Sequence, residues 1–264
     1  MKKNKFFGKY YKFVSKDGFS FAIITASSNE GDHIQLITKE KTYFNIDANS
    51  FKIDGSKIDI SIDNEDLILK GSIVLKELHP LKKDVMGPFR FMPLECKHNI
   101  YSMYHEVDGN ITFNDNTYSL DYGYIEGDEG TNFPKKYIWY NSVSEDYGIT
   151  FAVASIPFGP ITFTGLLCFI SYKDKEFRMT TYNLGKVKVN SPSNIVISKG
   201  KIKLEITIDE EILKGAHDLK APIKGSMDRY IKENVAIPSK AKLFYKDELI
   251  LQTDDPYSSY EYMF

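Results

Sequence analysis

Three carboxylates within four residues are the part of this sequence best suited to chemistry. Glu126, Asp128 and Glu129 lie in the glycine-rich segment 123–130, which leads toward the only tryptophan, Trp139. Proton-driven chemistry on an apolar substrate requires an acid beside aromatic surface, because the acid delivers the proton and the aromatic faces stabilise positive charge. The segment is therefore our first candidate for an active site.

The alternation of side chains along a strand separates these acids. Tyr124, Glu126 and Asp128 would share one face of an extended strand, and Glu129 would point to the other. If the shared face looks into a cavity, the two carboxyls interact and one of them stays protonated at neutral pH. We expect Glu126 to be the catalytic acid and Asp128 its coupled partner. The alternative is that residues 127–130 form a solvated acidic turn, because glycine and aspartate favour turns.

Aromatic and polar side chains near these acids would complete a binding site. Aromatic faces stabilise a cationic intermediate, and amide or imidazole groups orient a bound molecule by hydrogen bonds. For His98, a satisfied polar position inside the fold is the alternative. We expect ligand contacts from Tyr124, Trp139, Asn141, His98 and Tyr137.

No metal or cofactor is expected. Cys96, His98 and His105 could suggest a metal site, and Cys96 and His98 alternate onto one strand face, but a fourth metal ligand is not evident. The glycines at 123, 127 and 130 do not have the spacing of a dinucleotide-binding loop, and no strand-to-helix pattern follows them. The chemistry, if any, must come from the side chains themselves.

Other charged residues are expected to have structural roles. Glu95 and Glu233 have Arg90 and Arg229 near them in the sequence. Buried opposite charges usually pair with one another. We therefore expect ion pairs from these four residues, and not catalysis.

The composition narrows the class of protein. The chain has 264 residues, 42% hydrophobic and 14% aromatic, and its net charge of −2 gives no footprint for nucleic acid. The most apolar stretch, residues 149–172, is interrupted by prolines and glycines, so we expect no membrane span. The first residues lack an apolar leader pattern, and we expect a cytoplasmic protein with Cys96 and Cys168 as reduced thiols. The expected partner is a small apolar or prenylated ligand; no oligomeric state is predicted.

The pattern of the chain indicates an all-β protein. Short runs rich in Ile, Val, Phe, Tyr and Thr alternate with turn-forming residues. Residues 58–63 and 202–208 alternate strictly between apolar and polar side chains, as half-buried antiparallel strands do. Residues 16–18, 107–110 and 246–248 are predicted to be hairpin turns.

The chain also resembles itself. In order, the matching segments are 9–17 with 136–146, 19–23 with 149–153, and 68–71 with 212–215. We interpret this as an internal duplication that gives two tandem antiparallel β-barrels, residues 1–118 and 119–264, the second opening with segment 123–130. Chance similarity between two β-rich segments is the alternative. Barrels of roughly eight to ten strands can enclose one small apolar ligand, as lipocalins do.

Four segments resemble the tocopherol cyclase-like family. Residues 123–139 follow its pattern G-Y-I-E-K-D-W-G-x-S-F-P-x-x-Y-I-W, with matches at Gly123, Tyr124, Ile125, Glu126, Asp128, Gly130, Phe133, Pro134, Tyr137, Ile138 and Trp139. Residues 86–105 resemble its G-P-F…P-M-E-C-x-H…S-M-x-H segment, and residues 219–233 resemble its L-x-A-P…G-x-M-x-R-x-I-x-E segment. Residues 7–12 occupy the place of its opening F-E-G-W-Y-F-K.

The resemblance implies a fold and an activity. The fold is a tandem of lipocalin-like β-barrels shared with carotenoid-hydratase-like proteins, and the activity closes a chromanol ring on a prenylated hydroquinone. The chain departs from the family at Gly127 (lysine there), Glu129 (tryptophan) and Asn141 (glutamine), which changes the lining that would hold a substrate.

Two functions follow as hypotheses. The first is a cofactor-independent acid-catalysed cyclase or isomerase of a prenylated aromatic or isoprenoid substrate. The second is a non-catalytic lipocalin-like binding protein for a small apolar ligand. The pair Glu126 and Asp128 favours the first hypothesis, and Glu129 in the place of tryptophan favours the second.

Overall fold

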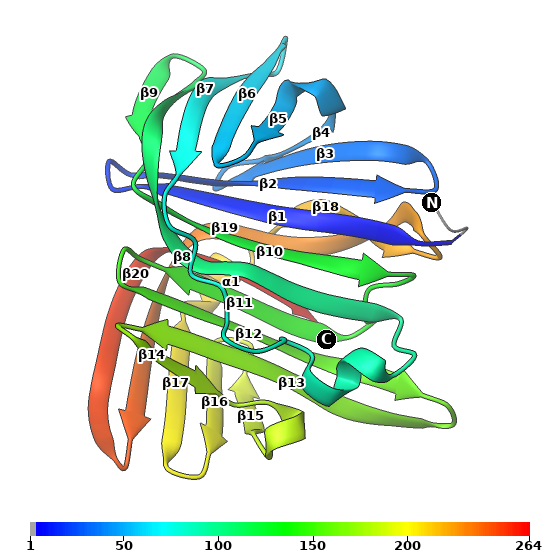
Figure 1. Cartoon of the computed structure of the whole chain (residues 1–264), viewed down its shortest axis with the longest axis vertical. Helices are drawn as coiled ribbons and strands as arrows, with labels where there is room; N and C mark the ends of the chain where they lie inside the picture. The colour runs from blue at the N-terminus through cyan, green and yellow to red at the C-terminus, as the bar shows by residue number, and fades with distance from the viewer. Residues whose placement is uncertain (1–3) are drawn as a thin grey trace.

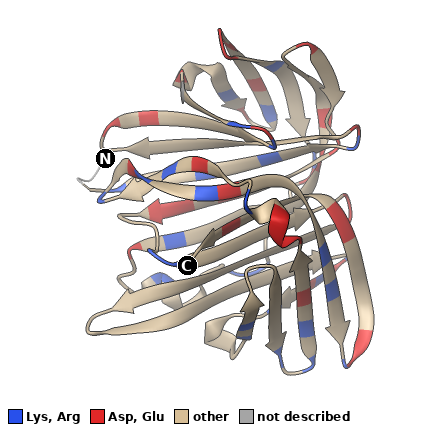
Figure 2. Cartoon of the chain, turned by 180° about the vertical axis from the view of Figure 1, so that it is seen from behind, with Lys and Arg blue, Asp and Glu red and all other residues tan. Residues whose placement is uncertain are grey.

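The computed structural model describes residues 4–264 and shows a protein built almost entirely of β-strands (Figure 1). Over this range twenty strands form two ten-stranded antiparallel sheets. The predicted all-β class with two tandem antiparallel units is confirmed. No helix within these residues combines the length and the hydropathy needed to cross a bilayer. Acidic and basic residues are interspersed over the side shown in Figure 2.

The first sheet contains the N-terminal half of the chain. Its strands are β1 (Phe6–Ser15), β2 (Phe19–Ser28), β3 (Gly31–Thr38), β4 (Thr42–Ile46), β5 (Phe51–Asp54), β6 (Lys57–Asn64), β7 (Leu67–Leu75), β8 (Cys96–Phe113), β9 (Asn116–Ser119) and β10 (Tyr122–Gly130). They are hydrogen-bonded in the order β4-β3-β2-β1-β10-β8-β7-β6-β5, and β9 pairs with β8. Two short 3-10 helices, η1 (Ala48–Ser50) and η2 (Gly87–Phe91), lie in the connections.

The second sheet repeats this arrangement. Its strands are β11 (Tyr137–Val143), β12 (Tyr147–Phe158), β13 (Ile161–Tyr172), β14 (Lys175–Arg178), β15 (Lys186–Ser191), β16 (Asn194–Lys199), β17 (Ile202–Ile208), β18 (His217–Ile223), β19 (Ser226–Tyr245) and β20 (Glu248–Met263). The order is β14-β13-β12-β11-β20-β19-β17-β16-β15, and β18 pairs with β19. The 3-10 helix η3 (Thr181–Asn183) and the helix α1 (Glu210–Leu213) complete the unit.

The common strand order agrees with an internal duplication. The first two sequence matches fall on corresponding strands, β1 with β11 and β2 with β12. The third match is wrong, because residues 68–71 lie in β7 whereas residues 212–215 lie at the end of α1. The side chain of Asp209 caps that helix, so a similar four-residue sequence adopts a different structure in the second unit.

The acidic segment lies on β10, which belongs to the first sheet and pairs with β1 and β8. The prediction that this segment opens the second unit is wrong, since its pairing with β1 joins the early and late strands of the first sheet. The chain passes to the second sheet between Gly130 and Tyr137. A division into folding units at residues 1–118 and 119–264 stays a prediction.

Most of the local predictions agree with the structure. Residues 58–63 and 202–208 lie in β6 and β17, and turns follow β1 and β19 as expected. The turn predicted at residues 107–110 is wrong, because these residues lie within β8 and pair with β7. Gly109 adopts a φ of +145° there, a conformation that glycine permits without ending the strand.

Each unit has its own packed core. Phe13 and Phe21 belong to the buried cluster of the first unit, and Tyr140 and Phe151 belong to that of the second. These large side chains are at most 1% exposed, so they fill the space in which a lipocalin would hold its ligand. That one barrel encloses a ligand stays a prediction.

A third buried cluster joins the two units. It includes Tyr10 and Tyr124 from the first unit and Trp139 and Val235 from the second. Figure 1 shows the units stacked, with β2 lying against β19 and β8 against β12. The outward faces of these strands therefore form an interface, and the acidic strand β10 lies within it.

Candidate active site between the two units

Strand β10 presents its acids to the second unit. Tyr124 and Glu126 are buried in the interface, Asp128 is half-buried on the same face, and Glu129 is exposed on the other. The predicted shared face is confirmed, and the alternative of a solvated turn is wrong, because the segment is paired on both sides. Packing explains the glycine at position 127, because a Cβ there would lie 2.6 Å from the carbonyl oxygen of Gly8.

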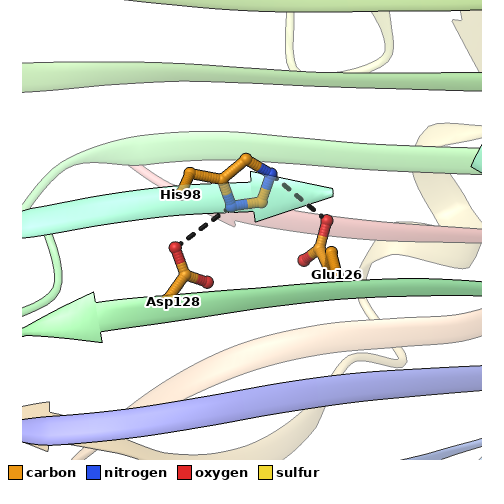
Figure 3. Close-up of side chains that lie close together, drawn as sticks. All are labelled: His98, Glu126 and Asp128. Carbon is orange, nitrogen blue, oxygen red and sulfur yellow. Dashed lines mark hydrogen bonds and ion pairs between the residues drawn. The ribbon is translucent and has the colours of Figure 1, made fainter. Parts of the chain in front are cut away.

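His98 of β8 lies between the two acids (Figure 3). Its Nδ1 is 3.1 Å from Oδ1 of Asp128, its neighbour across the strand pair, and its Nε2 is 3.5 Å from Oε2 of Glu126. The Sγ of Cys96 is 3.5 Å from the same Asp128 oxygen. An imidazole placed between two carboxylates is the arrangement expected of a protonated histidine.

The hydrogen bonds of Glu126 converge on a single oxygen. Its Oε2 accepts a hydrogen bond from the hydroxyl of Tyr124 at 2.5 Å and another from Nε1 of Trp139 at 3.0 Å. None of the hydrogen bonds made by the described residues involves Oε1. Since two donors are directed at Oε2, Oε1 is the oxygen available to carry the proton of a protonated Glu126.

The surroundings raise the pKa values of both Glu126 and His98. Burial raises the pKa of Glu126 to about 7; the positive charge of His98 opposes this rise and Asp128 adds to it. For His98, burial lowers the pKa, but the carboxylates of Asp128 and Glu126 outweigh this effect and raise it to about 9. At neutral pH the histidine is thus charged, and Glu126 exists in both protonation states.

An apolar cavity of about 120 Å³ opens beside these groups. Glu126, Asp128 and His98 line one side of it together with the rings of Tyr137 and Trp139. The rest of the lining is mostly apolar and includes Met86, Phe89, Phe133, Ala154, Ile156 and Leu167. The volume is comparable with that of an engineered cavity of about 150 Å³ that binds benzene.

The predicted ligand-contacting residues divide into three groups. His98, Tyr137 and Trp139 line the cavity together with the two acids. Tyr124 lies behind Glu126, where its hydroxyl also contacts Oγ1 of Thr150 at 3.2 Å. Asn141 does not line this cavity.

Asn141 is buried beside Lys12, whose Nζ donates to its Oδ1 at 3.2 Å. Lys12 is 0% exposed, and burial lowers its pKa to about 8. This lysine was not among the predicted functional residues. From the sequence alone, a lysine between Lys-Tyr-Tyr and Phe-Val on β1 would be predicted to point toward solvent.

Two further buried acids were not predicted as site residues. Glu233 of β19 accepts a hydrogen bond from Tyr10 at 2.7 Å, and Glu261 of β20 accepts one from Tyr137. Burial raises the pKa of Glu233 to about 8 and that of Glu261 well above its usual range. Glu261 stands between Tyr260 and Tyr262, an aromatic context that signals burial.

The ion pairs expected of Glu95 and Glu233 are not present among the described residues. Arg229 instead donates to the backbone carbonyls of residues 133–135, and Arg90 pairs with Asp84. Nearness in sequence did not bring Arg229 and Glu233 together, because β19 is extended and separates residues four positions apart by about 13 Å.

His98, Glu126 and Asp128 are also the described residues that could hold a metal ion. One ligand atom from each lies within 4.8 Å of the others. As arranged, both nitrogens of His98 face carboxylate oxygens, whereas a histidine that binds a metal must turn a lone pair toward it. That no metal is required stays a prediction.

Comparisons with known proteins show the fold. No family model and no curated protein matches the sequence. Kievitone hydratase from Nectria haematococca is similar in structure, with a TM-score of 0.56 and 9% identity over 98% of this chain and 89% of that one. CghA with Sch210972 has a TM-score of 0.62 and 6% identity over 98% and 88% of the two chains.

An AttH-like protein from Nitrosomonas europaea extends this likeness, with a TM-score of 0.50 and 9% identity over 98% of this chain and 92% of that one. In each case the likeness spans nearly the whole chain, and therefore both units. The tandem lipocalin-like fold implied by the sequence resemblance is confirmed; membership of the tocopherol cyclase-like family is not shown by these comparisons.

Proposed function

We propose that the protein is a cofactor-independent enzyme that protonates a carbon–carbon double bond of a small apolar substrate. Oε1 of Glu126 delivers the proton, and the carbocation formed is either captured by an O–H group of the same molecule or loses a proton from another carbon. In both cases the released proton returns to the carboxylate of Glu126. Capture closes a ring, and loss of a proton from another carbon moves the double bond. A prenylated aromatic or isoprenoid compound supplies such a bond.

One observation carries this proposal: a buried carboxyl with its pKa raised to about 7 lines an apolar cavity and has one oxygen free. A general acid is most effective when its pKa is near the working pH, and such catalysis typically contributes about 10²- to 10⁴-fold in rate. Glu126 meets this condition, and it also lines the cavity in which the substrate would lie.

The neighbours of Glu126 have complementary roles. The rings of Tyr137 and Trp139 line the cavity and stabilise a cation by their negative faces. After proton transfer, Tyr124 and Trp139 stabilise the carboxylate through the hydrogen bonds they already donate to it. Asp128 holds His98, and the charge of His98 limits how far burial raises the pKa of Glu126.

The fold likeness supports an enzyme that acts on small molecules, because kievitone hydratase is named for such a reaction. A non-catalytic binding protein is the second candidate, and the largely apolar lining of the cavity favours it. A cytoplasmic location remains part of the proposal.

Incubation with a prenylated hydroquinone, followed by chromatography for a product of the same mass, tests the proposal. We expect Glu126→Gln to lower turnover by at least about 10²-fold. Glu129→Gln is the matched control, since this neighbouring glutamate is exposed on the other face of the strand. Turnover that survives Glu126→Gln contradicts the assignment of the acid, and tight binding without turnover in the wild type supports the binding protein.

A further inference from the structure

A second cavity lies on the other side of the buried acids. It has a volume of about 70 Å³ and is built mainly from β1 and β2 of the first unit and β18 and β19 of the second. Glu126, Asp128, Phe133 and Glu261 line both cavities. The two cavities therefore adjoin, and these shared residues lie between them.

Glu233 lines only the second cavity, and it has an unsatisfied oxygen. The residue is 0% exposed; its Oε1 accepts the hydrogen bond from Tyr10, while its Oε2 is buried without a partner among the described residues. A buried polar atom without a hydrogen bond destabilises the folded state. A bound molecule that supplies the missing hydrogen bond removes this destabilisation.

The charges around the cavity favour a neutral partner. Burial raises the pKa of Glu233 to about 8, so the carboxyl is mostly neutral at neutral pH. Lys9 and Lys220 also line the cavity and offset the charge of the acids that share its lining, Glu126 and Asp128 among them. The remaining walls are largely apolar, with Phe6 and Ile231 among them. A hydroxyl group suits this site, because it donates to or accepts from a carboxyl group.

We propose that the second cavity is a binding subsite for the hydroxyl-bearing, apolar end of a neutral ligand, with the hydroxyl group hydrogen-bonded to Oε2 of Glu233. The inference rests on the proposed function in one respect, that the unsaturated part of the same molecule occupies the first cavity. The substrate class then narrows to compounds that carry a hydroxyl group and a double bond on opposite sides of Glu126.

Phenol and toluene test the subsite directly, because they share a ring and differ in a hydroxyl against a methyl group. Binding is followed by NMR through the indole N–H signal of Trp139, which is unambiguous because the chain has one tryptophan. Trp139 reports on both cavities, because it lines the first and its ring centroid lies 5.3 Å from that of Tyr10, which lines the second. We expect phenol to bind about tenfold more tightly than toluene in the wild type, which corresponds to one satisfied hydrogen bond.

Substitutions of Glu233 test the hydrogen bond. Glu233→Leu should bring the two affinities to within about twofold, whereas Glu233→Gln should keep the preference because an amide still hydrogen-bonds a hydroxyl. A preference for phenol that survives Glu233→Leu overturns the proposal, as does equal binding of the two probes by the wild type.

Two alanines provide a matched pair of blocking variants. Ala26 of β2 lines the second cavity and not the first, whereas Ala154 of β12 lines the first and not the second; they are 8% and 9% exposed. Ala26→Phe should abolish the preference for phenol, and Ala154→Phe should leave it intact. The reverse result places the probe in the first cavity and overturns the subsite.

The subsite and the proposed acid fail separately. Loss of turnover in Glu126→Gln with no preference for phenol refutes the subsite and leaves the acid in place. A preference for phenol that depends on Glu233, together with turnover that survives Glu126→Gln, refutes the acid and leaves the subsite in place.

Discussion

Trp139 of the second unit donates its indole N–H to Glu126 of the first unit across 3.0 Å, so one hydrogen bond joins the two units at the proposed acid. A hydrogen bond in the opposite sense runs from Tyr10 of the first unit to Glu233 of the second, at 2.7 Å. The rings of Tyr10 and Trp139 meet edge to face between them. The site therefore depends on both units, and neither unit contains it alone.

Removal of the charge on His98 should raise the pKa of Glu126. The imidazolium favours the ionised form of Glu126, so His98→Gln leaves the carboxylate without this support. In an NMR titration we expect the indole N–H signal of Trp139 to change at a higher pH in His98→Gln than in the wild type. An unchanged midpoint contradicts the proposed coupling.

Glu233 should make the folded state less stable as the pH rises. Its pKa in the folded protein is raised to about 8 from an ordinary value of 4.5, so the folded state binds this proton more tightly than the unfolded chain does. The stabilisation is complete below the unfolded pKa and is lost as pH rises through the folded value. Each tenfold difference in proton affinity corresponds to about 1.4 kcal/mol.

Glu233→Gln isolates this effect because glutamine cannot ionise. Between about pH 5 and about pH 8, urea denaturation should show a smaller loss of unfolding free energy in Glu233→Gln than in the wild type. Parallel pH dependences of the two proteins would show that Glu233 does not carry a raised pKa.

A chelator should leave the activity unchanged. His98 is held as a cation between two carboxylates, so the cluster already has its positive charge and no free imidazole lone pair. Turnover before and after dialysis against EDTA should agree within about twofold. A loss that added zinc or magnesium restores would assign the cluster of His98, Glu126 and Asp128 to a metal.

The interiors of the two units should contribute to stability and not to the site. Phe21 and Phe151 are at most 1% exposed and lie in the separate cores of the first and second unit. Replacement of either by alanine should cost about 3–5 kcal/mol of unfolding free energy. The indole N–H shift of Trp139 should remain as in the wild type, since this residue belongs to the third cluster. Loss of ligand binding in either folded variant would indicate that the site lies inside a barrel.

The sequence was sufficient for the fold class because the evidence for it is local. Alternating strands and their turns come from neighbouring residues, and the repeat of β1 and β2 in β11 and β12 survives as sequence similarity. The membership of β10 was mispredicted, because strand order depends on pairing between Tyr10 and Glu126, which lie far apart in the chain.

The site was predictable only in part. The alternation along β10 placed Glu126 and Asp128 correctly on one face. The position of His98 between them requires the pairing of β8 with β10, and the burial of Glu233 requires the contact between the units. Asn141 was predicted to contact the ligand, but its side chain contacts Lys12.

The central claim is that Glu126 ionises near neutral pH at the edge of the apolar cavity, and the indole N–H of Trp139 measures this directly. A ¹⁵N–¹H titration of the wild type from about pH 5 to about pH 9 should show one transition near pH 7, and Glu126→Gln should abolish it. A transition that persists in Glu126→Gln, or a signal that does not move in the wild type, would contradict the account.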